Sequence, residues 1–176
     1  MTIEIPRPGG GDVVDLVLED HRLFEDLLRR LRDETSDREA LRSALADVLV
    51  AHAEAEEQHV YPSLVRRDAI DDSDAEHSER EHDEGHEALL GLLEVDDVGS
   101  EDFGEALEEL TKALAHHLDE EERDILNPAR TDVPDATRAE LGQRFAAERA
   151  AQLDAGCGDI DNVRRLVERG HRRAGG

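Results

Sequence analysis

Apolar side chains recur along the chain at spacings of three and four residues, the pattern typical of α-helices that bury one face. The pattern predicts four long helices and two shorter ones, over residues 12–33, 38–66, 73–95, 100–127, 136–153 and 161–169. Asp12, Ser73 and Ser100 are expected to cap the first, third and fourth helices, because each is a short polar residue just before an apolar pattern begins. Four long amphipathic helices with short connections favour an all-α fold, an up-and-down antiparallel four-helix bundle with two additional C-terminal helices.

Prolines, acidic residues and glycines indicate where this helical pattern breaks. Pro62 is expected to kink the second helix or to end its regular part, and Pro128 and Pro134 are expected to bracket a loop. Residues 68–74 are expected to form an acidic loop, and the tail that contains His171 is expected to be disordered. The chain then divides into a flexible leader, a bundle and a C-terminal helical extension with its tail, at residues 1–11, 12–131 and 132–176. The extension would either cover the open end of the bundle or mediate formation of a homodimer.

The charge of the chain is extreme, with 46 acidic against 21 basic residues and a net charge of −25 at pH 7. Such a charge repels nucleic acid and anionic membranes, so neither is expected as a partner. Lys112 is the only lysine, and an acidic, lysine-poor surface suits a protein that stays hydrated in a saline cytoplasm, where salt screens its self-repulsion. Disorder is the competing explanation, which the aromatic content of 2% would fit. The helical period of the aliphatic residues argues against disorder.

The number of cysteines and the hydropathy of the chain indicate the cellular compartment of the protein. Cys157 is the only cysteine, so the chain forms neither an internal disulfide nor a multi-cysteine metal site, which fits a reducing compartment. Residues 1–11 contain no apolar run suited to a signal peptide, and no later segment has the length of a membrane span. The sequence therefore predicts a cytoplasmic protein.

Histidine and glutamate interrupt the apolar face of the second helix. His52 and Glu56 are four residues apart, so helix geometry places their Cβ atoms roughly 5–6 Å apart, where one metal ion could contact both side chains. The surrounding stretch has a near copy at residues 109–129, in which His117 and Glu121 take the same places. A motif that recurs in register with its flanking apolar residues indicates a shared role.

Three further histidines lie on apolar helix faces. His21 falls on the apolar stripe of the first helix, and His82 and His86 share a face of the third helix as a bidentate ligand pair. Histidines and glutamates on such faces are costly to bury unless a cation or several donors meet them. The predicted metal ligands are His21, His52, Glu56, His82, His86, His117 and Glu121. His77 lies off the inner face of its helix, where a solvated position is expected, and His116, rotated about 100° from His117, is assigned to the flank of its helix.

Five imidazoles and two carboxylates exceed the needs of one ion and suit two ions, with carboxylates available to bridge them. Nitrogen and oxygen donors without thiolate favour iron, manganese or zinc over an iron–sulfur cluster. One alternative is a metal-free structural bundle, in which hydrogen bonds satisfy each histidine. Another is a ferritin-like iron oxidase, suggested by the E-x-x-H spacing of Glu56 and His59, although Asp124 occupies the matching position of the second copy. Glu54 and Glu57 are expected to be solvated.

The two H-x-x-x-E motifs, the histidine of the first helix and the H-x-x-x-H motif of the third make the chain similar to the hemerythrin-like (HHE cation-binding) family, over residues 12–128. The resemblance implies an oxo- or hydroxo-bridged di-iron centre that binds dioxygen or a related small ligand. In that centre Glu56 and Glu121 bridge the ions and the histidines are terminal ligands. Oxygen-carrier hemerythrins have an aspartate five residues after the last histidine, whereas Glu121 stands four after it, as in the HHE branch. Glu57 and Glu122 remain alternative carboxylates.

The expected function is that of a non-catalytic di-iron protein that binds oxygen or a related small ligand, or that senses or buffers iron. No dedicated base, nucleophile or substrate pocket stands out beyond the metal ligands. The alternative is an enzyme in which the same centre reduces peroxide or nitric oxide.

Overall fold

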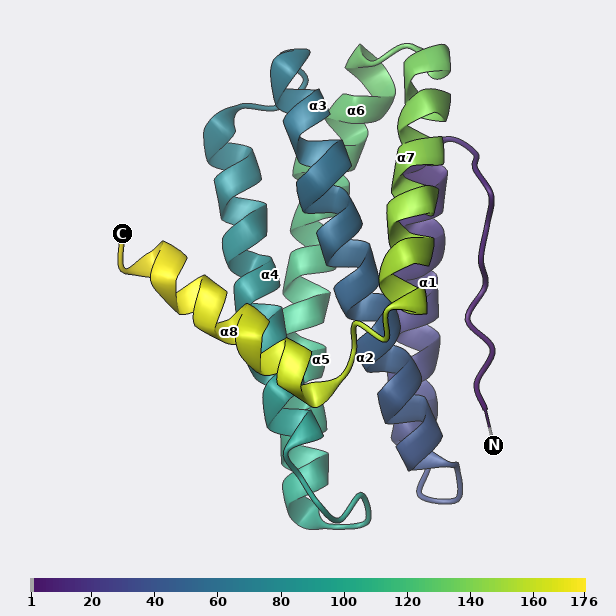
Figure 1. Ribbon diagram of the computed structural model, residues 1–176, viewed down its shortest axis with the longest axis vertical. Helices are drawn as coiled ribbons and strands as arrows, with labels where there is room; N and C mark the ends of the chain where they lie inside the picture. Colours follow the sequence, from purple (N-terminus) through teal and green to yellow (C-terminus); the bar gives the residue numbers. More distant parts are fainter. Residues whose placement is uncertain (1) are drawn as a thin grey trace.

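Helices joined by loops follow an extended N-terminal segment in the computed structural model, which describes residues 2–176 (Figure 1). The helices are α1 Val13–Leu31, α2 Arg38–Ala55, α3 Tyr61–Arg66, α4 Asp72–Leu93, α5 Glu101–Glu121, α6 Asn127–Asp132, α7 Asp135–Asp154 and α8 Ile160–Ala174, with π-helical turns η1 Glu56–Val60 and η2 Glu122–Leu126. Residues 2–176 contain no strand, which confirms the all-α prediction.

Short polar side chains determine where the long helices begin. Asp12 and Ser100 accept hydrogen bonds from backbone N–H groups of the first turns of α1 and α5, at 2.9 and 3.2 Å, so both predicted caps are confirmed. α4 begins after Asp71, whose carboxylate accepts from the N–H of Asp74 while the carboxylate of Asp74 accepts from the N–H of Asp71. This reciprocal capping box leaves Ser73 inside the first turn, so the prediction that Ser73 caps the helix was wrong.

The two helices that carry the repeated H-x-x-x-E motif both widen into a π-helical turn at the glutamate end of the motif. Each π turn precedes a proline, Pro62 or Pro128, which lacks an N–H and whose ring would clash with the carbonyl four residues earlier in a regular α-helix. A π turn accommodates this mismatch, so the chain stays helical as far as Arg66 and Asp132. The predicted loop between Pro128 and Pro134 was therefore wrong over most of its length.

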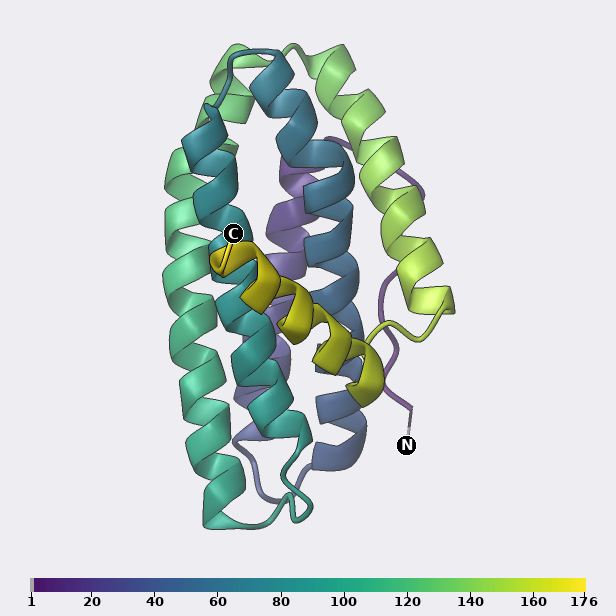
Figure 2. The same cartoon turned by 60° about the vertical axis from the view of Figure 1, so that its left-hand side comes forward.

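The helices α1, α2, α4 and α5 form four columns that lie side by side, and α2 and α5 continue through their π turns into α3 and α6. α1 packs against α2 and α5, and α4 packs against α5 and α2 (Figures 1 and 2). Consecutive columns are joined by short loops, so columns that follow one another in sequence run in opposite directions. α7 lies along α1 and α2, and α8 crosses α4. The two C-terminal helices thus cover the sides of the columns.

The apolar core has two parts. One part gathers around Phe24 and Phe103, and the other gathers around Tyr61 and Phe145. Between the two parts, a layer of buried histidines and glutamates interrupts the apolar pattern, as at His21, which lies one turn before Phe24 on α1. The packing of the columns therefore isolates this polar layer between two apolar regions.

α8 continues past His171, so the prediction that this tail is disordered was wrong. Arg169 pairs with Glu54 at 2.7 Å, and Arg173 pairs with Glu57 at 2.8 Å, which anchors α8 against the column that begins with α2. Glu54 and Glu57 are therefore held in ion pairs and largely shielded, and their predicted solvated positions were wrong.

Candidate metal centre

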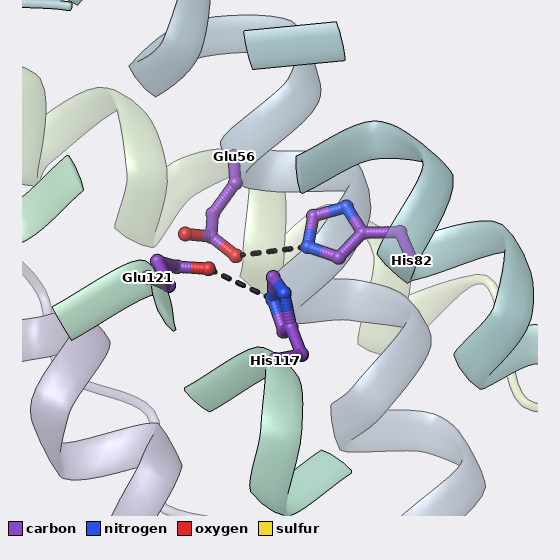
Figure 3. Close-up of side chains that lie close together, drawn as sticks. All are labelled: Glu56, His82, His117 and Glu121. Atoms are coloured by element: carbon purple, nitrogen blue, oxygen red, sulfur yellow. Dashed lines mark ion pairs between the residues drawn. The ribbon is translucent and has the colours of Figure 1, made fainter. Parts of the chain in front are cut away.

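Six of the seven predicted ligands meet in the polar layer. The ligand atoms of a first group lie within 4.8 Å of one another, and Figure 3 shows its side chains pointing together: Glu56, His82, His117 and Glu121. The ligand atoms of a second group also lie within 4.8 Å of one another: His21, His52 and Glu121. None of the six residues is more than 6% exposed, so water does not compensate for their polarity.

The inward-facing atoms of this layer lie close together without forming hydrogen bonds to one another. His52 Nε2 lies 2.7 Å from Glu56 Oε1, and His117 Nε2 lies 2.8 Å from Glu121 Oε2. Neither imidazole nitrogen has a hydrogen-bond partner, and the same holds for both carboxylate oxygens of Glu56. A hydrogen bond requires the N–H to point at its acceptor, so these side chains face a shared space rather than each other. A metal ion in that space would satisfy buried polar atoms that are otherwise costly.

The outward-facing Nδ1 atom of each of these imidazoles meets a carboxylate. His21 Nδ1 shares a hydrogen bond with Glu122 at 3.1 Å, His52 Nδ1 with Asp20 at 3.0 Å and His117 Nδ1 with Glu81 at 3.2 Å, whereas His82 Nδ1 lies 3.5 Å from Glu57 without a hydrogen bond. A carboxylate that accepts the Nδ1–H proton leaves the Nε2 lone pair available to a metal ion and fixes the orientation of the ring. Glu57 and Glu122 thus lie behind imidazoles, while Glu56 and Glu121 face the shared space.

The model of one protein family matches residues 12–129, and its description is the hemerythrin HHE cation binding domain. The chain belongs to the hemerythrin HHE cation-binding family. The resemblance drawn from the motifs is thereby confirmed, and the matched HHE domain contains all seven predicted ligands. No curated protein and no solved structure matches the chain significantly. Within residues 2–176, no helix combines the length and the apolar character needed to cross a membrane.

Helix α7 supports the HHE domain from outside the matched segment. Arg149 of α7 donates to both carboxylate oxygens of Asp20, from Nε at 2.9 Å and from Nη2 at 2.8 Å, and so holds the carboxylate that contacts His52. Sequence reasoning missed this pair. Asp20 adjoins His21 in the sequence, but the position of Arg149 depends on how α7 packs against α1.

Tyr61 is a second residue that the sequence reasoning missed. Its hydroxyl donates to Glu121 Oε2 at 2.9 Å and lies 3.4 Å from His82 Nε2. The neighbouring Pro62 was the only signal in this stretch, and it relates to the backbone rather than to a ligand. Tyr61 therefore brings a hydroxyl proton to the edge of the HHE centre, where burial together with Glu121 and Glu56 holds the pKa of the phenol well above its usual range.

Charge within the HHE layer is balanced between imidazoles and carboxylates. Burial acts against protonation of His52, but Glu56 and Asp20 outweigh it and raise the pKa of His52 to about 10. The pKa of His82 is raised by Glu56 and Glu57, again in opposition to burial. Burial would raise the pKa of the Glu56 carboxyl, yet His52 holds it well below its usual range. Protonated His52 and His82 thus act as counter-ions for these carboxylates, a role that divalent cations would take over as they displace the protons.

His86 is the predicted ligand that lies outside both groups of converging donors. It is buried, its Nδ1 has no hydrogen-bond partner, and burial lowers the pKa of its imidazole to about 3. Together with His52, His82 and His117, it lines a cavity of about 30 Å³, whose other walls are mostly apolar side chains of α1, α2, α4 and α5. His86 therefore borders the centre without having a partner of its own.

His59 lies apart from the centre. Its Nε2 is 3.7 Å from Glu148 of α7, and 32% of its side chain is exposed. The E-x-x-H element of a ferritin-like oxidase, which would pair His59 with Glu56, is therefore not assembled in this layer.

Proposed function

We propose that this protein is a non-haem di-iron protein of the HHE family that binds dioxygen or a related small ligand, or that senses or buffers iron. The four columns would form the up-and-down antiparallel four-helix bundle predicted from the sequence. The observation that carries the proposal is the single buried layer in which imidazole and carboxylate atoms from all four columns converge, several of which, including both oxygens of Glu56, lack a hydrogen-bond partner.

The two groups of donors suggest how the ligands divide between two ions. Glu121 belongs to both groups, which suits a bridging carboxylate. Glu56 suits the second bridge, because its Oε1 lies 2.7 Å from His52 of one group and 3.5 Å from His82 of the other. One ion would then be held by His21 and His52, and the other by His82 and His117, with the bordering His86 as a further candidate ligand beside His82 and His117. Mixed imidazole and carboxylate donors suit iron, while manganese and zinc are less favoured alternatives.

The cavity beside the layer favours a small ligand. Its volume of about 30 Å³ exceeds the space that one water molecule requires, and Phe24, Leu49, Leu89 and Leu114 contribute apolar walls. Bound iron would supply a redox-active centre with an affinity for small diatomic ligands. The surrounding chain would admit a small ligand and exclude larger substrates.

Reduction of peroxide or nitric oxide is the second candidate function. The observation that favours it is the Tyr61 hydroxyl, which donates to Glu121 at 2.9 Å and could deliver a proton beside the centre. Turnover of peroxide or nitric oxide by the iron-loaded protein, lost in Tyr61→Phe with the iron content unchanged, would favour the enzyme. Absence of turnover in the wild type would remove it.

Metal analysis after gentle purification and iron addition tests the main proposal. We expect two iron ions per chain, near-ultraviolet absorption typical of a bridged ferric pair, and a melting temperature that falls when iron is removed, because a bound ion stabilises the folded state by mass action. His52→Ala and His117→Ala should each lose iron, whereas the control His59→Ala should retain it. Fewer than one ion per chain after iron addition, or two ions retained by both ligand variants, would overturn the proposal.

A dioxygen cycle separates reversible binding from iron handling. The reduced protein is exposed to air, and its absorption spectrum is recorded before and after the oxygen is removed. Reversible changes would support oxygen binding, and one-way oxidation would favour a role in sensing or buffering iron.

A further inference from the structure

A second group of potential metal ligands lies on the outer side of α4 and α5, which pack side by side (Figure 2). Its members are His77 and Glu81 on α4 and His116 and Glu120 on α5, and we call them the outer cluster. On each helix the histidine and the glutamate are four residues apart, so they share one face. The outer cluster therefore repeats, between two helices, the H-x-x-x-E arrangement found inside the bundle.

Each imidazole of the outer cluster faces a carboxylate of the opposite helix. His77 Nε2 lies 2.6 Å from Glu120 Oε2, and His116 Nε2 lies 3.3 Å from Glu81 Oε2. Each histidine also faces the glutamate of its own helix, at 3.7 Å for His77 with Glu81 and 3.4 Å for His116 with Glu120. Ligand atoms of His77, Glu81 and Glu120 lie within 4.8 Å of one another. Three donors thus converge from two helices, and the imidazole of His116 lies beside two of them, Glu81 and Glu120.

The buried member of the outer cluster indicates that a cation belongs there. Glu81 is only 6% exposed, and its Oε2 has no hydrogen-bond partner. A carboxylate oxygen in that position has lost its water without gaining a donor, which is costly unless a positive charge is near. Within residues 2–176, no arginine or lysine forms an ion pair with Glu81 or Glu120. The histidines are therefore the only partners that the described chain supplies.

We propose that the outer cluster is a metal site, separate from the buried centre, that binds one divalent ion of the zinc type. Two imidazole nitrogens and two carboxylate oxygens match the ligand types and the coordination number of zinc in proteins. The exposed rings of His77 and His116 can turn toward an ion, because 49% and 64% of their side chains are accessible. The buried Glu81 fixes the position of the site.

The outer cluster is linked to the buried centre through one carboxylate. Glu81 Oε2 faces the outer cluster, while Glu81 Oε1 lies 3.2 Å from Nδ1 of His117. A carboxylate behind a metal-ligating histidine raises the basicity of that ligand, and a cation on the same carboxylate would reduce this effect. Zinc in the outer cluster should therefore weaken the hold of His117 on iron and speed the release of iron. This consequence, unlike the outer site itself, rests on the proposed di-iron function.

Zinc titration of the iron-loaded full chain, in competition with a chromophoric chelator, tests the outer site. We expect one tight equivalent of zinc for the wild type. A supporting residue behind a ligand is worth roughly 10- to 100-fold in metal affinity, so His116→Ala and His77→Ala should each weaken this equivalent at least that much. The control is His171→Ala, an exposed histidine on α8 that contacts Glu87 instead. Cobalt in place of zinc should give the intense visible absorption of a four-coordinate ion in the wild type and not in His116→Ala.

Equal zinc binding by the wild type and by His116→Ala would overturn the outer site, and so would the absence of any tight equivalent in the wild type. If the protein fails to load iron, the comparison of the wild type with His116→Ala still decides the outer site, because that residue is no part of the buried layer. The link is tested separately by the rate at which iron passes to a chelator with and without zinc. An unchanged rate in the wild type would overturn the link while leaving the zinc stoichiometry to decide the site.

Discussion

Replacement of Asp20 by asparagine is expected to weaken the fold and the metal centre for two separable reasons. Asp20 is 5% exposed and Arg149 is 2% exposed, so their ion pair is almost fully buried. The guanidinium donates to Asp20 at 2.8 and 2.9 Å, and Asp20 Oδ2 also lies 3.0 Å from His52 Nδ1. Asparagine preserves the shape of the side chain but removes its charge. Arg149 would then be buried without a counter-ion, and His52 would lose the carboxylate behind its ring.

The two effects differ in magnitude and in how they can be reversed. Removing one partner of a buried ion pair costs roughly 3–5 kcal/mol in the free energy of unfolding, a large share of the roughly 5–15 kcal/mol typical of a folded protein. Loss of the group behind a ligating histidine costs roughly 10- to 100-fold in metal affinity, or about 1.4–2.7 kcal/mol. Adding Arg149→Met removes the stranded charge but leaves His52 unsupported. The double variant should therefore regain most of the stability and none of the iron affinity.

Denaturant unfolding in the presence of a chelator measures the first effect, and competition between the protein and a chelator for iron measures the second. Asp15→Asn is the matched control, because it makes the same chemical change at an exposed position of α1, where Asp15 pairs with Arg130 at 3.2 Å. Neither quantity should change in that variant. Wild-type iron affinity in Asp20→Asn, or recovery of iron affinity in the Arg149→Met double variant, would refute the role assigned to Asp20.

Two further predictions concern the cavity and the single thiol. Gly85 lines the cavity, and a Cβ atom there would meet no atom within 4 Å. Gly85→Leu should therefore slow ligand binding in stopped-flow measurements, whereas the control Gly91→Leu, at an equally open position of α4 away from the cavity, should not. Equal rates in the two variants would count against the cavity as the ligand space. Burial, assisted by Asp47, raises the pKa of Cys157 to about 12, which lowers the thiolate fraction near pH 8 by roughly a thousandfold. Alkylation of Cys157 in the native protein near pH 8 should therefore be at least roughly a hundredfold slower than after unfolding, and its rate should keep rising through pH 9. Similar rates in the native and unfolded states would contradict the buried position of the thiol.

The buried centre and the outer cluster show the same chemistry at two levels of exposure. In both, imidazoles and carboxylates are arranged one helical turn apart, and a buried carboxylate oxygen lacks a hydrogen-bond donor, as in Glu56 inside the bundle and Glu81 near its surface. In a chain with a net charge of −25, cations are attracted to the whole surface. The partnerless buried oxygen is what distinguishes these two places from the many solvated acidic residues.

The sequence by itself determined the helices and the ligand pairs within them. Apolar spacing located α1, α2, α4 and α5, and the four-residue spacing placed His52 beside Glu56 and His117 beside Glu121. These relations depend only on the geometry of a single helix, which is the same in every protein, so that residue order suffices to read them. The family followed from the same motifs.

Only the tertiary structure decided what lies behind the ligands. The contacts of Arg149 with Asp20 and of Glu81 with His117 join helices that are distant in sequence, and they depend on the rotation and the height of each helix in the packed molecule. A change of one residue in helix register would turn either side chain by about 100° and break its contact. The same dependence separates Glu57, which was expected in solvent and lies behind His82, from Glu56, which faces the centre. Helical period reveals which face of a helix is buried, but the partners across that face are set by long-range packing.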